Sequence, residues 1–188
     1  MRSLAALGLA LFLSGCGSSP ATQFYTLAPV PSQAPMRPMS GTLLQVEAVH
    51  IPPALDRQEM VRESGPNKLD VSDQNRWGAP FDEMTRRVLT QDLTERLPKG
   101  VVVLPEEPAP PQADKIVVDI LQFDCDPSGK VIFDGSWSLL RNGSEKAVMS
   151  RHVQLSESAD PGNYGSQARA MSRILGELAD DIAMTSGP

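Results

Sequence analysis

The N-terminal segment most constrains the fold, because its composition removes it from any packed core. Residues 4–13 form an unbroken apolar run preceded by Arg2, the only charged residue among the first 36. This run is about half the length that a membrane-spanning helix needs, and a basic start before a short apolar segment is typical of a secretory signal. Residues 16–41 then carry five prolines among small and polar residues, which predicts an extended tether. The folded domain is therefore expected within residues 42–188.

The apolar run ends in Leu13-Ser14-Gly15-Cys16, which resembles the bacterial lipobox. In such a motif a peptidase cleaves before the cysteine, here between Gly15 and Cys16. The new N-terminal cysteine then carries a diacylglycerol thioether and an amide-linked acyl chain of the palmitate class, and two or more acyl chains give stable anchoring. The alternative is an ordinary secretory signal with an incidental cysteine, although the small-residue cleavage pattern adjoins Cys16 itself. Gly17 follows instead of an aspartate, which favours the periplasmic face of the outer membrane over the inner membrane.

The composition excludes several classes of function. The 188 residues include 17 Lys and Arg against 23 Asp and Glu, and a formal net charge of −6 does not favour nucleic-acid binding. Two cysteines and two histidines cannot build a structural zinc cluster or a disulfide framework. The sequence contains neither a G-x-x-x-x-G-K-[ST] phosphate loop nor a G-x-S-x-G nucleophile elbow. We therefore expect no catalytic residue, no metal and no cofactor beyond the covalent lipid on Cys16, and we expect Cys125 to be a small buried side chain.

Hydrophobic periodicity divides residues 42–188 into strands and helices. Pro80 suits the start of a helix, and apolar residues then recur at three- and four-residue spacing until Pro98-Lys99-Gly100 ends the pattern. The aromatic segment at residues 23–27 is β-prone, so it is expected to add a short strand to the domain. The predicted strands are residues 43–50, 59–62, 68–71, 101–104, 115–125, 130–140 and 145–155, and the predicted helices are about 80–97 and 163–184.

The register of the C-terminal hairpin, 130–140 with 145–155, follows from the parity of its apolar residues. Residues that face each other in a hairpin share one face of the sheet, so odd-numbered residues must pair with odd-numbered residues. This excludes a two-residue Asn142-Gly143 turn and predicts a three-residue loop, 141–143, with Gly143 left-handed. His152 is then expected on the exposed polar face. The apolar faces are Val131, Phe133, Trp137 and Leu139 on one strand and Ala147, Met149, Val153 and Leu155 on the other.

Three arginines and a tryptophan lie in one short stretch of this acidic chain, and two interpretations are open. Arginine and tryptophan are enriched at interface hot spots, which would make Arg57, Arg62, Arg76 and Trp77 a partner-binding surface. The alternative is structural: Trp77 covers the start of the helix and the arginines form ion pairs with neighbouring carboxylates at positions 56, 59 and 70.

Two motifs in this region resemble a known family. They are Ile51-Pro52-Pro53-Ala54-Leu55-Asp56-Arg57-Gln58-Glu59-Met60-Val61-Arg62 and Arg76-Trp77-Gly78-Ala79-Pro80-Phe81, in the order and at the spacing found in PqiC-like ABC-type transport auxiliary lipoproteins. The lipobox followed by Phe24-Tyr25-Thr26-Leu27 fits the same family. The resemblance covers essentially the whole mature chain, with Met60 and Phe81 in place of commoner aliphatic residues.

The resemblance implies a single α/β domain with a mixed sheet and two main helices. The chain's own pattern agrees, because residues 43–50, the helix at 80–97 and residues 101–104 can form one right-handed β-α-β crossover. It also implies a non-enzymatic outer-membrane lipoprotein that maintains envelope integrity. Its implied partners are an MCE-domain protein and inner-membrane ABC and permease components that move lipid or other hydrophobic cargo, with self-association left open. The alternative is a periplasmic carrier that binds lipid in an apolar cavity of its own.

Overall fold

The structure is a computed structural model that describes residues 21–32, 42–141 and 144–185. The predicted signal segment, the lipidation site at Cys16 and the predicted left-handed turn at Gly143 lie outside the described residues and stay predictions. Within the described part of the chain, no helix is long and apolar enough to cross a membrane.

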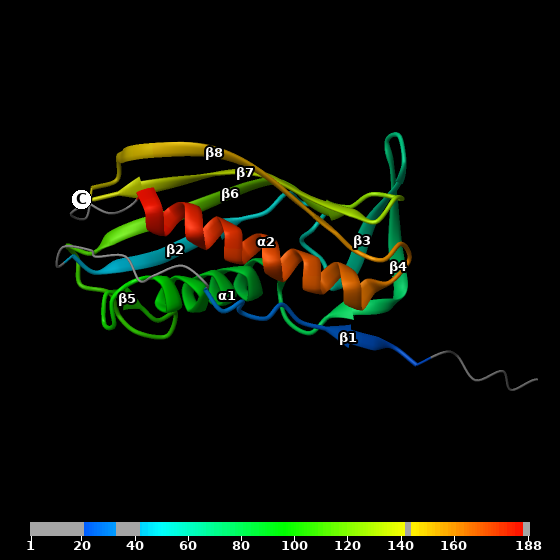
Figure 1. Cartoon of the computed structure of the whole chain (residues 1–188), viewed down its shortest axis with the longest axis horizontal. Coiled ribbons are helices and arrows are strands. Elements are labelled where there is room, and N and C mark those ends of the chain that lie inside the picture. The colour runs from blue at the N-terminus through cyan, green and yellow to red at the C-terminus, as the bar shows by residue number, and fades with distance from the viewer. Residues whose placement is uncertain (1–20, 33–41, 142–143, 186–188) are drawn as a thin grey trace, which may run out of the picture.

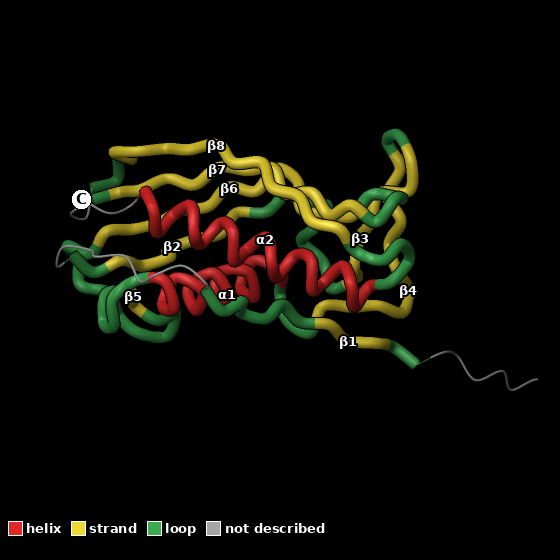
Figure 2. The backbone as a smooth tube through the Cα atoms, in the orientation of Figure 1, coloured by secondary structure: helices red, strands yellow, loops and turns green. Residues whose placement is uncertain are grey.

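The described residues form one α/β domain with two helices and two sheets, which confirms the predicted fold class. Both helices lie on the same face of the larger sheet, and the smaller sheet stands at one end of the molecule (Figures 1 and 2). The strands are β1 (Gln23–Tyr25), β2 (Leu44–His50), β3 (Glu59–Gly65), β4 (Lys68–Trp77), β5 (Val102–Val103), β6 (Asp114–Cys125), β7 (Lys130–Leu140) and β8 (Ala147–Ser158), and the helices are α1 (Phe81–Arg96) and α2 (Tyr164–Thr185).

The larger sheet is mixed, with the strand order β5-β2-β6-β7-β8. Strand β2 is parallel to both β5 and β6, whereas β6, β7 and β8 form an antiparallel meander. The parallel pairing of β2 with β5, with α1 between them along the chain, confirms the pairing that the predicted crossover requires. The segments predicted at 59–62 and 68–71 are the two arms of a longer hairpin, β3 and β4, which forms the smaller sheet together with β1.

The register of β7 and β8 confirms the odd-with-odd pairing but corrects the predicted loop. Phe133 faces Leu155 and Leu139 faces Met149, so the apolar residues share one face, and His152 is exposed as expected. The pairing then shifts by one residue, because Leu140 faces Ala147 and leaves Val148 as an extra residue on β8. A bulge of this kind changes the parity of the ladder. The connection between the strands is therefore residues 141–146, not the three-residue loop that a regular ladder predicts.

Residues 21–32, here called the strap, belong to the folded domain. The predicted short strand is present as β1, which runs parallel to the end of β4. Leu27 is buried in the core, and the backbone N–H of Ala28 donates to the Ser172 hydroxyl on α2 at 3.2 Å. The extended tether predicted for residues 16–41 is therefore interrupted by a segment that packs on the helices, because its aromatic and aliphatic residues gain more from burial than a free tether would.

The core lies between the helices and the sheets and is built around aromatic side chains. Phe123 and Phe133 meet edge to face with ring centroids 5.3 Å apart, and both are fully buried. Trp137 is also fully buried, and its indole N–H donates to Asp181 on α2 at 2.8 Å, which satisfies its one polar group. Cys125 is 2% exposed and unpaired within the described residues, as expected for a small core side chain, and burial raises the pKa of its thiol.

Gly135 on β7 should be intolerant of a side chain. A Cβ atom there would lie 2.7 Å from the backbone oxygen of Asp119 and 3.1 Å from the Phe133 ring, both fixed within the sheet. We expect Gly135→Ala to lower the free energy of unfolding by about 1–3 kcal/mol in urea titrations. The matched control is Gly78→Ala, where the nearest atom would be at an ordinary 3.5 Å and the expected change is within about 0.5 kcal/mol. Equal unfolding midpoints for the two variants would contradict this packing.

Candidate functional site

The four residues predicted to bind a partner lie at the β1 end of the molecule, but they do not form one exposed surface. Arg57 is exposed in the turn before β3. Arg76 is partly exposed and its guanidinium lies 3.5 Å from the Glu59 carboxylate, which is one of the ion pairs that the structural interpretation predicted. Arg57 and Arg76 are therefore the members of the predicted set whose charge is available at the surface.

Arg62 is inside the domain, which corrects its assignment to an exposed partner-binding surface. Its side chain is 9% exposed, and its Nε donates to the Gln167 side-chain oxygen at 2.7 Å. The guanidinium lies 3.7 Å from the centre of the Tyr164 ring, a cation–π contact. These contacts attach β3 to the first turns of α2. The charge of Arg62 therefore serves the packing of the domain, and it contacts α2 rather than one of the carboxylates at positions 56, 59 and 70.

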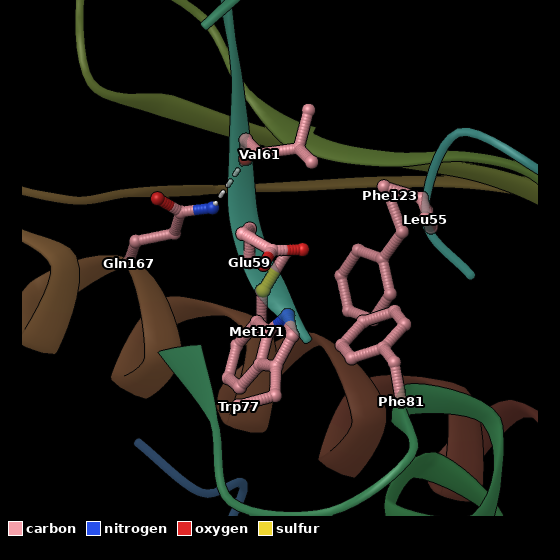
Figure 3. A pocket seen from close by; sticks show the side chains of 8 residues that line it. All are labelled: Leu55, Glu59, Val61, Trp77, Phe81, Phe123, Gln167 and Met171. Carbon is pink, nitrogen blue, oxygen red and sulfur yellow. Dashed lines mark hydrogen bonds between the residues drawn. The ribbon is translucent and has the colours of Figure 1, made fainter. Parts of the chain in front are cut away.

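Trp77 also takes the structural role. It is 4% exposed, and its ring centroid lies 5.0 Å from that of Phe81 at the start of α1. Between Trp77, Phe81, Phe123 and their neighbours lies a buried cavity of about 10 Å³ (Figure 3). Such a volume holds about one water molecule. The Gln167 amide at its edge donates to the Val61 carbonyl at 3.1 Å, so this end of the core is filled and offers no space for a hydrophobic ligand.

A larger hollow of about 420 Å³ lies at the surface, open to solvent, between the strap and α2. Val30, Pro31 and Met184 supply its apolar lining. Its rim is charged: Arg173 donates to the Glu157 carboxylate at 2.8 Å, and burial, then the neighbouring Glu157, raises the pKa of Glu177. The hollow is therefore an open, largely apolar groove with charged residues at its rim, and not an enclosed pocket.

Beside this groove, two side chains of α1 hold the backbone of the strap at Val30. The Asp92 carboxylate accepts the Val30 N–H at 2.7 Å, and the Arg96 guanidinium donates to the Val30 carbonyl at 3.2 Å. Arg96 also donates to Asp180 on α2 at 2.7 Å. Gly176 permits this close approach, because a Cβ there would lie 3.2 Å from Val30 and 3.3 Å from Arg96. We call Asp92, Arg96 and Asp180 the Val30 clasp.

The Asp92 carboxyl group of the Val30 clasp is a weaker acid than an ordinary aspartate. Asp92 is fully buried, and one of its oxygens has no hydrogen-bond partner among the described residues. Burial raises the pKa of Asp92 to about 6, although the Val30 N–H and the Arg96 charge oppose the shift. Sequence reasoning missed the clasp, because the only local signal is an acid and a base four residues apart on one helix. The Val30 backbone N–H that donates to Asp92 is 62 residues away in sequence.

Comparisons with known proteins agree with this architecture. A sequence model of ABC-type transport auxiliary lipoprotein components matches residues 25–183. The chain belongs to this family. It is 27% identical over 176 residues to the intermembrane transport lipoprotein PqiC of Escherichia coli K12, covering 93% of this chain and 91% of that protein, and equally similar to PqiC of Shigella flexneri. The family resemblance inferred from the two sequence motifs is therefore confirmed.

Two crystal structures share the fold. One, of an uncharacterized protein, has a TM-score of 0.75 and 22% identity, and the match covers 89% of this chain and all of that one. The other, of a protein from Xanthomonas campestris, has a TM-score of 0.70 and 16% identity, and the match covers 87% and 96% of the two chains. Membership of the family makes this chain an auxiliary lipoprotein component of a transport system.

The placement of the arginines predicts that charge reversal lowers the stability of the domain strongly at position 62 and hardly at position 57. Arg62→Glu should cost about 3–5 kcal/mol of unfolding free energy, because it puts a carboxylate into a buried site built for a cation. Arg57→Glu, at an exposed position, should change stability by less than about 0.5 kcal/mol. Urea denaturation followed by circular dichroism measures both. A stable Arg62→Glu protein would show that β3 does not depend on this contact.

The pKa of Asp92 predicts a pH-dependent stability. The folded state binds this proton more tightly than the unfolded chain, whose aspartate pKa is near 3.8, so stability is lost as the pH rises through about 6. Relative to Asp92→Asn, the wild type should lose up to about 3 kcal/mol between about pH 4 and 7. Unfolding titrations at several pH values measure the difference. The exposed Asp73→Asn variant corrects for the loss of one carboxylate, and a difference that is constant with pH would exclude titration of Asp92 in this range.

Proposed function

We propose that this protein is an adaptor subunit of an ABC and MCE-type transport system for lipid or other hydrophobic cargo. In this proposal, acyl chains on Cys16 hold it at the periplasmic face of the outer membrane. It connects that membrane to an MCE-domain protein and to inner-membrane ABC and permease components, and by doing so it maintains envelope integrity. The family description supports a transport role, and the relatives in Escherichia coli and Shigella carry the name of intermembrane transport lipoproteins.

The observation that carries the adaptor role is the shape of the two hollows among the described residues. A protein that carries lipid needs an enclosed apolar pocket of several hundred Å³. The buried cavity beside Trp77 holds about 10 Å³, and the groove of about 420 Å³ beside Val30 is open to solvent and has charged residues at its rim. Neither fits an acyl chain that must be shielded from water. This favours a surface that binds a protein partner over a cavity that binds cargo.

The surface offers a specific residue for such a partner. The chain has a net charge of −6, but Arg57 places positive charge at an exposed position in the turn before β3, whereas Arg76 is paired with Glu59. Local charge of this kind contributes to orientation and specificity more than to affinity. In the proposal Arg57 contacts an acidic surface of the MCE-domain partner or of a second copy of this chain.

A Cys16→Ser variant tests both the anchor and the adaptor role. Loss of the only thiol in the lipobox should abolish acylation and release a soluble, normally folded protein during detergent-free fractionation. Mass spectrometry of organic extracts of this soluble protein should detect no stoichiometric lipid, because neither hollow among the described residues encloses a lipid. The acylated wild type, cross-linked in intact cells, should co-purify with an MCE-domain protein.

The outcomes separate the two roles. Stoichiometric lipid in the Cys16→Ser protein would replace the adaptor with the carrier. A Cys16→Ser protein that still sediments with the outer membrane would show that acylation is not what holds it there. Retained solubility and absence of lipid, without any MCE-domain protein among the cross-linked partners, would leave the anchor in place and overturn the partnership.

A further inference from the structure

The docked strap shortens the distance over which the domain can move from its anchor. Six residues lie between Cys16 and Gln23, the first residue of β1, so seven Cα-to-Cα steps connect the two. Fully extended, seven steps reach about 24 Å, and as a coil they span roughly 15 Å. A tether that ran free to residue 41 would reach several times further. The length of chain before β1 therefore decides which end of the domain meets the membrane.

The strap is fixed along its length, so this short connection cannot lengthen by peeling from the domain without breaking many contacts. Gln23, Phe24 and Tyr25 are in register with residues 75–77 of β4. The Tyr25 carbonyl accepts the Gly78 N–H at 2.8 Å, Leu27 is 4% exposed in the core, and the Val30 clasp holds the far end. The chain that connects Cys16 to the folded domain therefore meets the domain at β1 and not at β2.

The β1 end carries residue types that suit a lipid surface. Phe24 is 66% exposed, which makes it a large exposed aromatic side chain on the strand nearest to Cys16. Arg76 is its cross-strand neighbour, so both side chains project from the same face of the small sheet. Arg169, exposed on α2, lies close to Tyr25 beside Gly165. Phe24 therefore has one arginine on its own face of the sheet, Arg76, which is paired with Glu59 at 3.5 Å, and Arg169 lies near the opposite face beside Tyr25. An exposed aromatic ring beside an arginine fits the boundary between acyl chains and phosphate headgroups.

We propose that the β1 end of the domain rests on the lipid surface of the membrane that anchors it, with the Phe24 ring at the acyl boundary and Arg76 among the headgroup phosphates. The inference rests on acylation of Cys16. Helix α2 begins beside β1 and is 22 residues, or about 33 Å, long. This length exceeds the reach of the chain between Cys16 and β1. The C-terminal end of α2 lies at the opposite end of the molecule from β1 (Figure 1). In this proposal that end, with the groove beside Met184, points away from the membrane, towards partners that approach across the periplasm.

A site-specific probe on the acylated protein tests this orientation. Phe24→Cys and Met184→Cys place a reactive thiol at opposite ends of the molecule, at side chains that are 66% and 55% exposed. The acylated Cys16 sulfur is blocked as a thioether, and Cys125 is 2% exposed, so an environment-sensitive fluorophore labels only the new position. Each labelled protein is reconstituted into phosphatidylethanolamine and phosphatidylglycerol vesicles that carry a nitroxide lipid.

We expect the fluorophore at position 24 to shift to shorter wavelength and to be quenched several-fold more strongly than the one at position 184. The double variant that combines Phe24→Cys with Arg76→Gln should show weaker quenching at position 24.

Mass spectrometry of the N-terminal peptide establishes acylation independently. An acylated protein whose two probes are quenched equally, or not at all, overturns the inference and leaves the anchor intact. A protein that is not acylated removes the anchor of the proposed function as well. Protection of position 24 only in native envelopes, and not on pure vesicles, would assign β1 to a protein partner and also overturn the inference.

Discussion

A chain of aromatic rings in tilted and edge-to-face contact holds the two sheets and the first helix together, and the rest of the structure depends on it. Trp77 at the end of β4 contacts Phe81 at the start of α1 at 5.0 Å, Phe81 contacts Phe123 on β6 at 5.8 Å, and Phe123 contacts Phe133 on β7 at 5.3 Å. Aromatic pairs at these separations stabilise beyond the area that they bury. Because the small sheet joins the larger one through these rings, the position of β4, and with it the position of β1, follows from the packing of the core.

That arrangement also determines where the N-terminal strap packs. Strand β1 is only three residues long and would not be stable alone, but it pairs with the end of β4 next to Trp77. The strap then contacts both helices and reaches the Val30 clasp, where an acid and a base of α1 bind one backbone unit and Asp180 of α2 binds the base. A segment that composition describes as a tether is thus a structural element of the domain.

The positive residues illustrate how one residue type serves different purposes within a short stretch. Arg62 is buried against α2. Arg57, before β3, and Arg76, on β4, reach the surface. Strand alternation alone does not separate them, because β3 buries three consecutive residues, Met60, Val61 and Arg62, between α2 and β6. A cluster in the sequence is therefore divided in the structure, and the surface open to a partner is smaller than composition suggested.

The sequence by itself determined the two helices, the strands of the larger sheet, the odd-with-odd register of β7 and β8, and the family, because each depends on local periodicity or on residues adjacent in the chain. The tertiary structure alone decided the rest. The bulge at Val148 changes the loop between β7 and β8, since a ladder irregularity leaves no local signal. The burial of Arg62 needs Tyr164 and Gln167 from the other end of the chain. The strap and the Val30 clasp arise because Asp92 and Arg96 meet a backbone unit more than sixty residues earlier. Contacts of this range depend on the packing of helices against a sheet, which composition and spacing do not encode.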